Sequence, residues 1–221
     1  MTIAAEVKPA LGRPQRTVLE GRYVRLEPLG PEHAADLYAA SSDEGAAGRY
    51  RYLFESAPAS LADMEAWVHR VHMGEDPLVF AVVDRATGRA GGRQSLMRIV
   101  PEHGVIEIGG IYWGPGVART RLATEALYLF ARHSFDDLGY RRFEWKCNNA
   151  NEPSKRAAER FGFTFEGVFR QHMIQKGENR DTAWFSMLDS EWPTRKAGFE
   201  RWLDDSNFDA EGRQKTPLSV R

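Results

Sequence analysis

Short runs in which hydrophobic and polar residues alternate recur along the chain, and they predict β-strands. The run Tyr23-Val-Arg-Leu-Glu27 is one of them. Two short polar connections, Arg85-Ala-Thr-Gly88 and Pro101-Glu-His-Gly104, are typical of antiparallel hairpin turns. We expect strands at 23–27, 78–84, 92–100, 105–113, 141–147, 163–174 and 182–188.

Other segments repeat their apolar residues every three or four positions, which predicts helices. Leu61, Met64 and Val68 show this spacing. Asn151 is a good N-cap and Gly162 a good residue just beyond a helix end, so the pair brackets a further helix. We expect helices at 31–40, 61–73, 120–138, 151–161 and 191–203.

The order of these elements predicts a mixed α/β (α+β) fold. Hairpins force antiparallel pairing over 78–113, whereas the strand–helix–strand at 105–147 can form a parallel crossover. We therefore expect one mostly antiparallel sheet of about seven strands rather than a doubly wound parallel one. The 221 residues suffice for a single domain. We place it at 18–203, between a flexible N-terminal arm (1–17) and a polar tail (204–221) that is disordered or draped over the surface.

The composition of the chain argues against several classes of binding partner and site. Lys+Arg 30 and Asp+Glu 31 give a formal net charge of -1, which argues against a nucleic-acid partner. The sequence has no long apolar run, so we expect no membrane partner. The single cysteine, Cys147, excludes an intramolecular disulfide and fits a cytoplasmic location; we interpret it as an inert core thiol. Glu65, His69 and His72 share a helix face, but they are better explained as the polar border of an apolar stripe, and we expect no metal.

The segment 109–125 is rich in glycine at two points. Gly109 and Gly110 inside a strand suggest a β-bulge or a close approach of another backbone, and Gly114-Pro-Gly116 makes a tight loop into a helix start. Free N–H groups at a helix start suit a phosphate or pyrophosphate, and Arg119 and Arg121 add charge there. The alternative is a glycine-rich connection with two solvated arginines. Neither a Walker loop nor a dinucleotide fingerprint is present.

Five motifs follow one another in the second half of the chain. They are Ala123-Thr-Glu-Ala-Leu127, Leu138-Gly-Tyr-Arg-Arg142, Asn151-x-x-Ser154, Arg160-Phe-Gly-Phe163 and Glu166-Gly-Val-Phe-Arg170. In this order the chain resembles the GNAT superfamily of N-acetyltransferases, in the branch of the ribosomal-protein N-terminal acetyltransferases. The resemblance covers roughly 21–188. It implies helices on both faces of the sheet and a V-shaped splay between the fourth and fifth strands, where acetyl-CoA binds.

The resemblance also implies where the donor binds. The strand end that the pantetheine arm extends is Ile111, Tyr112 and Trp113, and Asn151 matches an asparagine that hydrogen-bonds the pantetheine arm of CoA. The residues of the pyrophosphate loop are Arg119, Thr120, Arg121, Leu122 and Ala123. This loop departs from the family pattern, because Ala118 and Arg121 stand where a polar residue and a glycine are usual; the two arginines are expected to compensate. For Asn151 the alternative role is the helix cap alone.

The catalytic residues are expected at Glu107 and Ser154. Glu107 lies between Ile106 and Ile108, and a carboxylate near the splay can take a proton from the attacking amine; the alternative is a glutamate of an edge strand that faces solvent. Ser154 is a candidate general acid, since the position of the family's usual tyrosine is Ala158. A helical serine is more often bonded to the preceding turn. Asp181 is a second acidic candidate, although a turn-stabilising role fits it better.

These features predict an acyl-CoA-dependent N-acyltransferase. The donor is acetyl-CoA, the acceptor is a primary amine on a peptide N-terminus or a small molecule, and the amine attacks directly in a ternary complex. The alternative is a non-catalytic CoA-binding sensor or partner-binding module. The sequence leaves open whether the protein is a monomer or a homodimer, because the last helix with Trp202 can pack on its own sheet or on a partner.

Overall fold

The computed structural model describes residues 7–220, and one sheet organises them. The 8-stranded sheet has the order β1-β2-β3-β4-β5-β6-β8-β7, and within the described residues β5 with β6 is its single parallel pair. The predicted mixed, mostly antiparallel sheet is thereby confirmed, and the extra strand is the short β1. The strands are β1 Leu19–Glu20, β2 Val24–Pro28, β3 Leu78–Asp84, β4 Ala90–Val100, β5 Val105–Trp113, β6 Arg142–Asn148, β7 Thr164–Gln175 and β8 Glu178–Leu188.

Three of the helices, α3, α4 and α5, begin at a residue whose side chain caps them. The Ser60, Thr120 and Asn151 side chains each accept a backbone N–H of the helix that follows. The helices are α1 Ala34–Ala40, α2 Ala46–Tyr50, α3 Leu61–Val71, α4 Arg121–Arg132, α5 Glu152–Arg160 and α6 Trp192–Leu203. All five predicted helices are present. The α-helical part of α4 ends earlier than expected, because a π-helical turn, His133–Asp137, follows it; the short α2 was not predicted.

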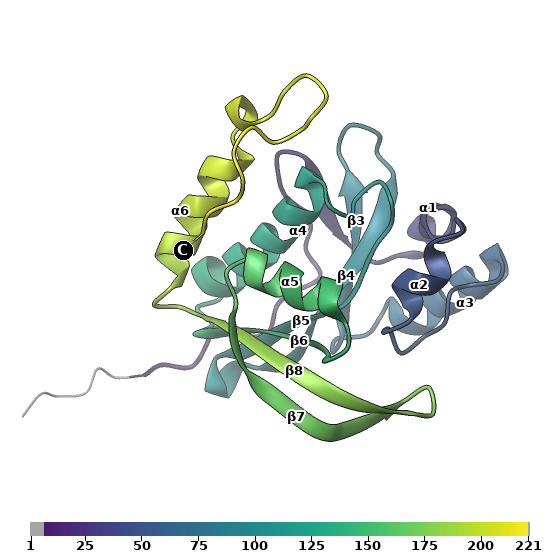
Figure 1. Ribbon diagram of the computed structural model, residues 1–221, viewed down its shortest axis with the longest axis horizontal. Coiled ribbons are helices and arrows are strands. Elements are labelled where there is room, and N and C mark those ends of the chain that lie inside the picture. Colours follow the sequence, from purple (N-terminus) through teal and green to yellow (C-terminus); the bar gives the residue numbers. More distant parts are fainter. Residues whose placement is uncertain (1–6, 221) are drawn as a thin grey trace, which may run out of the picture.

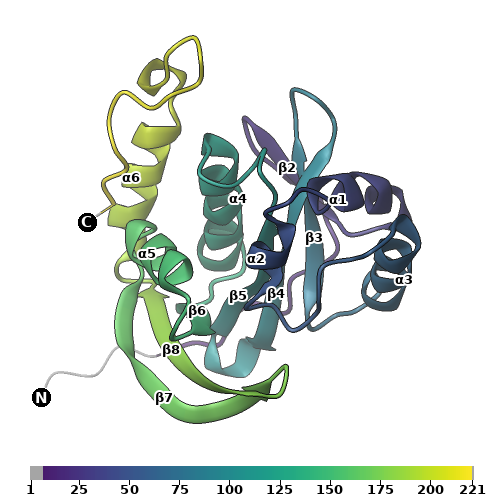
Figure 2. The same cartoon turned by 45° about the vertical axis from the view of Figure 1, so that its right-hand side comes forward.

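Helices lie on both sides of the sheet (Figure 2). On one side, α4, α5 and α6 pack over the larger core, which includes Ile106, Phe143 and Phe185. On the other side, α1 and α3 cover β3 through a smaller core that includes Val79 and Val68. This arrangement confirms the helices expected on both faces.

Beyond α1 and α3, the second side of the sheet is polar. Side chains alternate along a strand, so the neighbours of the core residues on β5, β6 and β8 point away from α4. We call this surface the polar face; its residues are Glu107, Glu144, Lys146, Arg180, Thr182, Trp184 and Ser186. Strands β7 and β8 form a long curved hairpin next to it (Figure 1).

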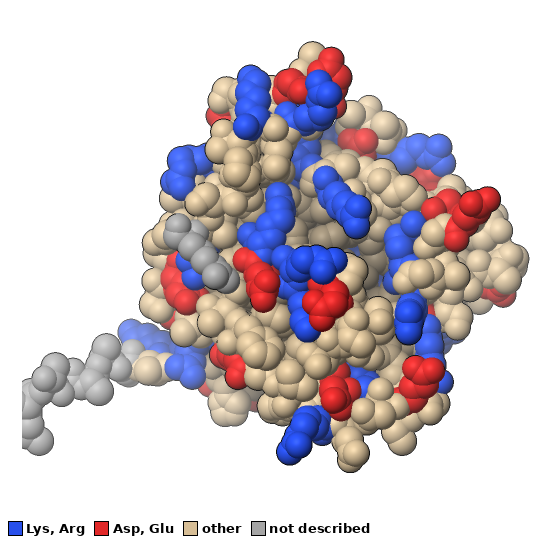
Figure 3. All heavy atoms as spheres, in the orientation of Figure 1, with Lys and Arg blue, Asp and Glu red and all other residues tan. Residues whose placement is uncertain are grey.

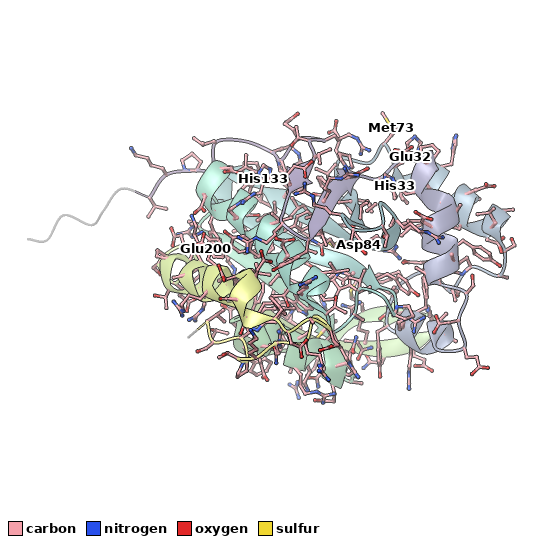
Figure 4. All side chains as sticks on the ribbon, turned by 90° about the horizontal axis from the view of Figure 1, so that it is seen from above. Glu32, His33, Met73, Asp84, His133 and Glu200 are labelled. Carbon is pink, nitrogen blue, oxygen red and sulfur yellow. The ribbon has the colours of Figure 1, made fainter. Side chains whose placement is uncertain are left out.

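Both chain ends are attached to the domain. The Ala10 and Leu11 N–H groups donate to the Pro101 and Leu138 carbonyls, so the described part of the expected N-terminal arm is held down; residues 1–6 lie outside the described part. Helix α6 packs on α4, where the Tyr128 hydroxyl donates to Glu200 Oε1 at 2.9 Å (Figure 4). The tail after α6 is draped over the domain and buries Phe208 and Val220. The division at 17 and 203 stays a prediction.

Trp202 is buried within its own chain. Its ring contacts Phe208 edge-on with centroids 5.1 Å apart, and its indole N–H donates to Gln214 Oε1. Of the two alternatives for the last helix, packing within the chain is therefore the observed one.

Candidate active site

Strands β5 and β6 separate halfway along their length. Their parallel pairing runs from Val105 with Arg142 to Ile108 with Trp145 and then stops. Beyond that point β5 continues beside β4, while β6 continues beside β8. This separation, which we call the splay, confirms the splay expected between the fourth and fifth predicted strands.

A β-bulge lies where the splay opens. Ser95 pairs with Gly109 and Arg93 with Tyr112, so β5 has one more residue than β4 between these pairs. Gly110 has a φ of 56°, a conformation that glycine adopts without strain. The bulge predicted from the paired glycines is confirmed, and it leaves backbone groups of β5 next to a gap in the sheet.

The start of α4 lies just beyond β5 and has free backbone donors. Thr120 Oγ1 accepts the Leu122 N–H at 3.1 Å. The Arg121 and Ala123 N–H groups have no acceptor among the described residues. Such N–H groups, together with the helix dipole, suit a phosphate group, so this helix start fits the expected pyrophosphate loop.

The two arginines of this loop differ in environment. Arg119 is exposed, with a φ of 63°. The Arg121 guanidinium instead lies 4.2 Å from the ring centroid of Tyr23 and 5.3 Å from that of Phe208. This packing argues against the expected ion pair between the Arg121 side chain and a phosphate, because Phe208 of the tail and Tyr23, which precedes β2, hold the guanidinium. The Arg121 backbone N–H still belongs to the helix start.

A further cation comes from the end of α5. Arg160 Nη1 donates to Thr124 Oγ1 on the first turn of α4 at 3.1 Å, and no carboxylate of residues 7–220 pairs with it. Burial lowers the pKa of Arg160. Lys and Arg side chains gather near the middle of the face that carries α4 and α5 (Figure 3). This surface therefore suits the phosphates of a nucleotide donor.

The three residues at the end of β5 that were expected to contact the donor differ in which of their groups can bind a ligand. Tyr112 is buried and its hydroxyl donates to the Ala40 carbonyl at 2.8 Å, so it offers a ligand only its backbone. Trp113 donates to Gln94 Oε1 and contacts the Phe161 ring edge-on. Ile111 is half-buried against the larger core.

The first turn of α5 faces the splay from the α4 side. Asn151 Oδ1 accepts the Ser154 N–H at 3.2 Å, so the helix-cap role is observed; its Nδ2 has no partner within residues 7–220. Ser154 Oγ accepts the Trp145 indole N–H at 3.0 Å, and its own proton can be donated to the neighbouring Cys147 sulfur. Burial raises the pKa of the adjacent Cys147 thiol, consistent with an inert core residue.

Glu107 lies on the polar face, on the opposite side of the splay from Ser154. Its side chain is 6% exposed, and Oε2 lies 2.8 Å from Lys146 Nζ and 3.0 Å from Arg98 Nε. The alternative of a solvent-facing glutamate is therefore wrong, because β5 is an interior strand. Burial raises the pKa of Glu107, against the opposing effect of Lys146 and Arg98.

The second oxygen of Glu107 points toward the bulge. Oε1 has no partner among the described residues, and a Cβ placed on Gly109 would lie 3.4 Å from it. One carboxylate oxygen is thus held by two cations and the other is free beside the splay. A free oxygen with a raised pKa suits proton transfer.

Asp181 has a structural role on the β7–β8 hairpin. Its Oδ1 accepts the Gln171 N–H at 2.7 Å and the Asn179 amide at 2.9 Å. The backbone bond from Gln171 and the bond from Asn179 lower the pKa of Asp181. The turn-stabilising interpretation is therefore the one observed.

Three charged residues near Glu107 were not predicted: Arg98, Lys146 and Arg180. Lys146 lies on β6 between Glu107 and Glu144, and its Nζ is 3.8 Å from the Trp184 ring centroid. The alternation of charged and apolar residues in Phe143-Glu-Trp-Lys-Cys147 is a sequence signal that could have placed Lys146 on the polar face.

A separate pocket lies between α3 and the segment after α2. Its volume is about 270 Å³, and its lining includes Tyr50, Glu55, Trp67 and Arg93. Arg93 donates to the Gly110 carbonyl of the bulge at 2.5 Å and is also paired with Glu55. The pocket therefore adjoins the bulge on its β4 side and has no unpaired buried charge.

The chain matches a known family and known structures. The family model described as "Acetyltransferase (GNAT) domain" matches residues 24–164. The chain belongs to the GNAT family of acetyltransferases. A GCN5-related N-acetyltransferase from Brucella melitensis is 57% identical, with a TM-score of 0.93 over 96% of this chain and 96% of that chain. This GNAT chain is thus related to N-acetyltransferases along nearly its whole length.

Two further relatives are more distant. The uncharacterized N-acetyltransferase p20 of Bacillus licheniformis is 29% identical over 117 residues, which span 51% of this GNAT chain and 63% of that relative. The Microcin C7 self-immunity acetyltransferase MccE, solved in complex with acetyl-CoA and AMP, shares the fold, with a TM-score of 0.65 and 21% identity over 76% of this chain and 93% of that one.

Metal-binding groups and membrane-spanning helices are both absent from residues 7–220 of this GNAT chain. No group of three His, Cys, Asp or Glu side chains in residues 7–220 is placed to hold a metal ion, and His72 Nδ1 lies 2.9 Å from the His69 carbonyl. Within the same residues, none of the helices has the length and apolar character to cross a membrane.

Proposed function

We propose that this GNAT protein is an acetyl-CoA-dependent N-acyltransferase that transfers an acetyl group directly to a primary amine. The observation that carries the proposal is the position of Glu107 Oε1, free and beside the bulge at which β5 and β6 part. The acceptor is a peptide N-terminus or a small-molecule amine. We place the enzyme in the cytoplasm, for which the unpaired Cys147 is suited, and a homodimer is compatible with this proposal.

Donor binding uses the splay and the start of α4. Backbone groups of Ile111 to Trp113 would pair with the pantetheine arm, and Asn151 Nδ2 would donate to it. The free N–H groups of Arg121 and Ala123 would bind the pyrophosphate, with Arg119 and Arg160 as countercharges. The bound acetyl-CoA in MccE, which shares the fold, supports this donor.

The reaction then needs two proton transfers. Alkylammonium groups have a pKa near ~10, so the amine must lose a proton to attack, and Glu107 Oε1 would take it directly or through water. Attack on the thioester carbonyl gives a tetrahedral intermediate, which a backbone N–H at the bulge would stabilise. On its collapse the C–S bond breaks; Ser154 would donate its proton to the leaving thiolate and regain one, through water, from the nitrogen, which loses its second proton as the amide forms.

The two candidate groups lie on opposite faces of the sheet. Ser154 approaches the splay from the α5 side and Glu107 from the polar face. This geometry supports an acceptor that arrives on the polar face and a thiol that leaves toward α5, with both substrates bound together.

Free-thiol release measures the proposed reaction. Acetyl-CoA and a panel of primary amines are mixed with the enzyme, and CoA thiol and N-acetylated amine are quantified together. The proposal predicts equal amounts of both. If calorimetry shows that acetyl-CoA binds but no amine causes release of the CoA thiol, the protein is the alternative, a non-catalytic CoA-binding sensor. That alternative is motivated by Ala158 at the position of the usual tyrosine and by the altered pyrophosphate loop.

Asn151→Asp should separate the two roles of this residue. Aspartate still accepts the Ser154 N–H, so the free energy of unfolding should stay within about 0.5 kcal/mol of wild type. It lacks the Nδ2 donor, so the KM for acetyl-CoA should rise about tenfold. Asn151→Ala is the matched comparison and should in addition lose about 1 kcal/mol of stability. An unchanged donor KM in both variants would leave Asn151 as a cap alone.

The Arg119→Ala, Arg160→Ala double variant should bind acetyl-CoA about tenfold to a hundredfold more weakly, because two countercharges of the phosphates are lost. Calorimetry at fixed ionic strength measures this affinity. Arg70→Ala, an exposed arginine on α3, is the control and should bind normally. Wild-type affinity in the double variant would show that the two arginines are merely solvated.

A further inference from the structure

Arg180 on β8 is a buried cation without a carboxylate partner. The residue is 7% exposed. Its Nε donates to Thr182 Oγ1 and its Nη1 to Gln175 Oε1, each at 3.3 Å, and no Asp or Glu of residues 7–220 lies at ion-pair distance. Burial lowers the pKa of Arg180. An ion buried among neutral partners costs free energy unless something else compensates it.

The neighbouring charges already neutralise one another. Three carboxylates, Glu107, Glu144 and Glu166, are in ion pairs with three cations. The cations are Arg98, Arg142 and Lys146. Among the described residues of the polar face, Arg180 is therefore the positive charge left over.

Arg180 points to the same side of β8 as Trp184, on the polar face. Glu107 lies on the same face, and its charge opposes the lowering of the Arg180 pKa by burial. The Phe54 ring centroid lies 5.3 Å from its guanidinium, and the adjoining segment is fixed to the hairpin, where Gln175 Nε2 donates to the Tyr52 carbonyl at 2.9 Å. The cation is thus held in a defined position on the same face of the sheet as the proposed base.

We infer that the acceptor amine carries a carboxylate, and that Arg180 binds this carboxylate while the amine reaches Glu107. The inference rests on the proposed function and names the substrate class. A guanidinium matches a carboxylate in shape and charge and forms two parallel hydrogen bonds with it. The acceptor would supply the countercharge that the chain does not provide.

A series of paired acceptors tests this inference. Each α- or ω-amino carboxylate, of increasing length between amine and carboxylate, is compared with its own carboxamide, which has the same shape and no charge. For the best-fitting length, wild-type kcat/KM should be about tenfold to a hundredfold higher for the carboxylate. In Arg180→Gln this ratio should fall to about one.

Two further variants support the comparison. Arg180→Lys keeps the positive charge but cannot form the two parallel hydrogen bonds of a guanidinium, so it should retain part of the preference. This partial retention would distinguish a loss of carboxylate binding from a folding defect in Arg180→Gln. Arg170→Gln changes an exposed arginine on β7 and should keep the full preference. The inference is overturned if wild type shows no preference in any pair, or if Arg180→Gln keeps it.

A binding measurement keeps this test independent of turnover. With CoA present, the N-acetylated carboxylates and N-acetylated carboxamides are titrated into the protein by calorimetry. Tighter binding of the carboxylates, lost in Arg180→Gln, with no thiol release, would contradict the proposed function while showing that Arg180 binds a carboxylate. Equal binding of both products by wild type, with active turnover, would contradict the inference alone.

Discussion

Glu107→Gln should slow acetyl transfer by about 10²–10⁴, the usual contribution of a positioned base. The amide keeps the shape of the side chain but cannot take the proton at the position of Oε1. Acetyl-CoA affinity should stay near wild type, because the donor is proposed to bind at the start of α4. Pre-steady-state measurement of amide formation at saturating substrates checks the chemical step.

The pH profile gives a second readout of this variant. Burial raises the pKa of Glu107 above the ordinary value of a glutamate. A base must be ionised, so wild-type kcat/KM should fall as the pH decreases through this raised pKa. In Glu107→Gln that inflection should be absent, and higher pH should partly restore the rate by supplying neutral amine.

Glu144→Gln is the matched control for Glu107→Gln. Glu144 also pairs with Lys146, at 2.6 Å, but its contacts are Lys146 and Arg142 rather than the bulge. Its loss should change the rate by only a fewfold. Normal turnover and an unshifted pH profile in Glu107→Gln would remove Glu107 from the mechanism, whereas equal losses in both variants would indicate a general effect of the ion pairs.

Glu125→Ala should destabilise the fold by about 3–5 kcal/mol, a large share of the stability of an ordinary domain. Glu125 on α4 accepts three backbone N–H groups, from Arg22, Tyr23 and Val24, at 2.7, 2.6 and 2.8 Å. Alanine would leave all three without an acceptor at a largely buried position. Urea unfolding at neutral pH measures the change.

Glu159→Ala is the control for Glu125→Ala. Glu159 is an exposed glutamate on α5 without a side-chain partner among the described residues, so its removal should change stability by less than about 0.5 kcal/mol. A Glu125→Ala variant within about 1 kcal/mol of wild type would show that water replaces the carboxylate.

Local sequence predicted those parts of the site that depend on local structure. The paired Gly109 and Gly110 predicted the bulge, and Asn151 predicted the cap of α5; both are confirmed. The sheet followed from the order of the predicted elements, and the splay followed from the motif resemblance. The bulge and the cap each depend on a few neighbouring residues, whose backbone preferences can be recognised in the sequence.

Contacts between distant segments were not predicted. Lys146 meets Glu107 only because β6 pairs with β5 in a particular register. Arg121 stacks on Tyr23 and Phe208 because the tail folds back over α6, which no local pattern indicates. Arg180 is likewise placed by the curved hairpin of β7 and β8.

Quantifying CoA thiol and acetylated amine in the same reaction tests the central claim most directly. With acetyl-CoA and a primary amine, wild type should release one thiol for each amide formed, with both signals dependent on the amine, and Glu107→Gln should lose both together. Thiol release without an acetylated amine, or acetyl-CoA binding with neither product across the amine panel, would contradict direct acetyl transfer by this protein.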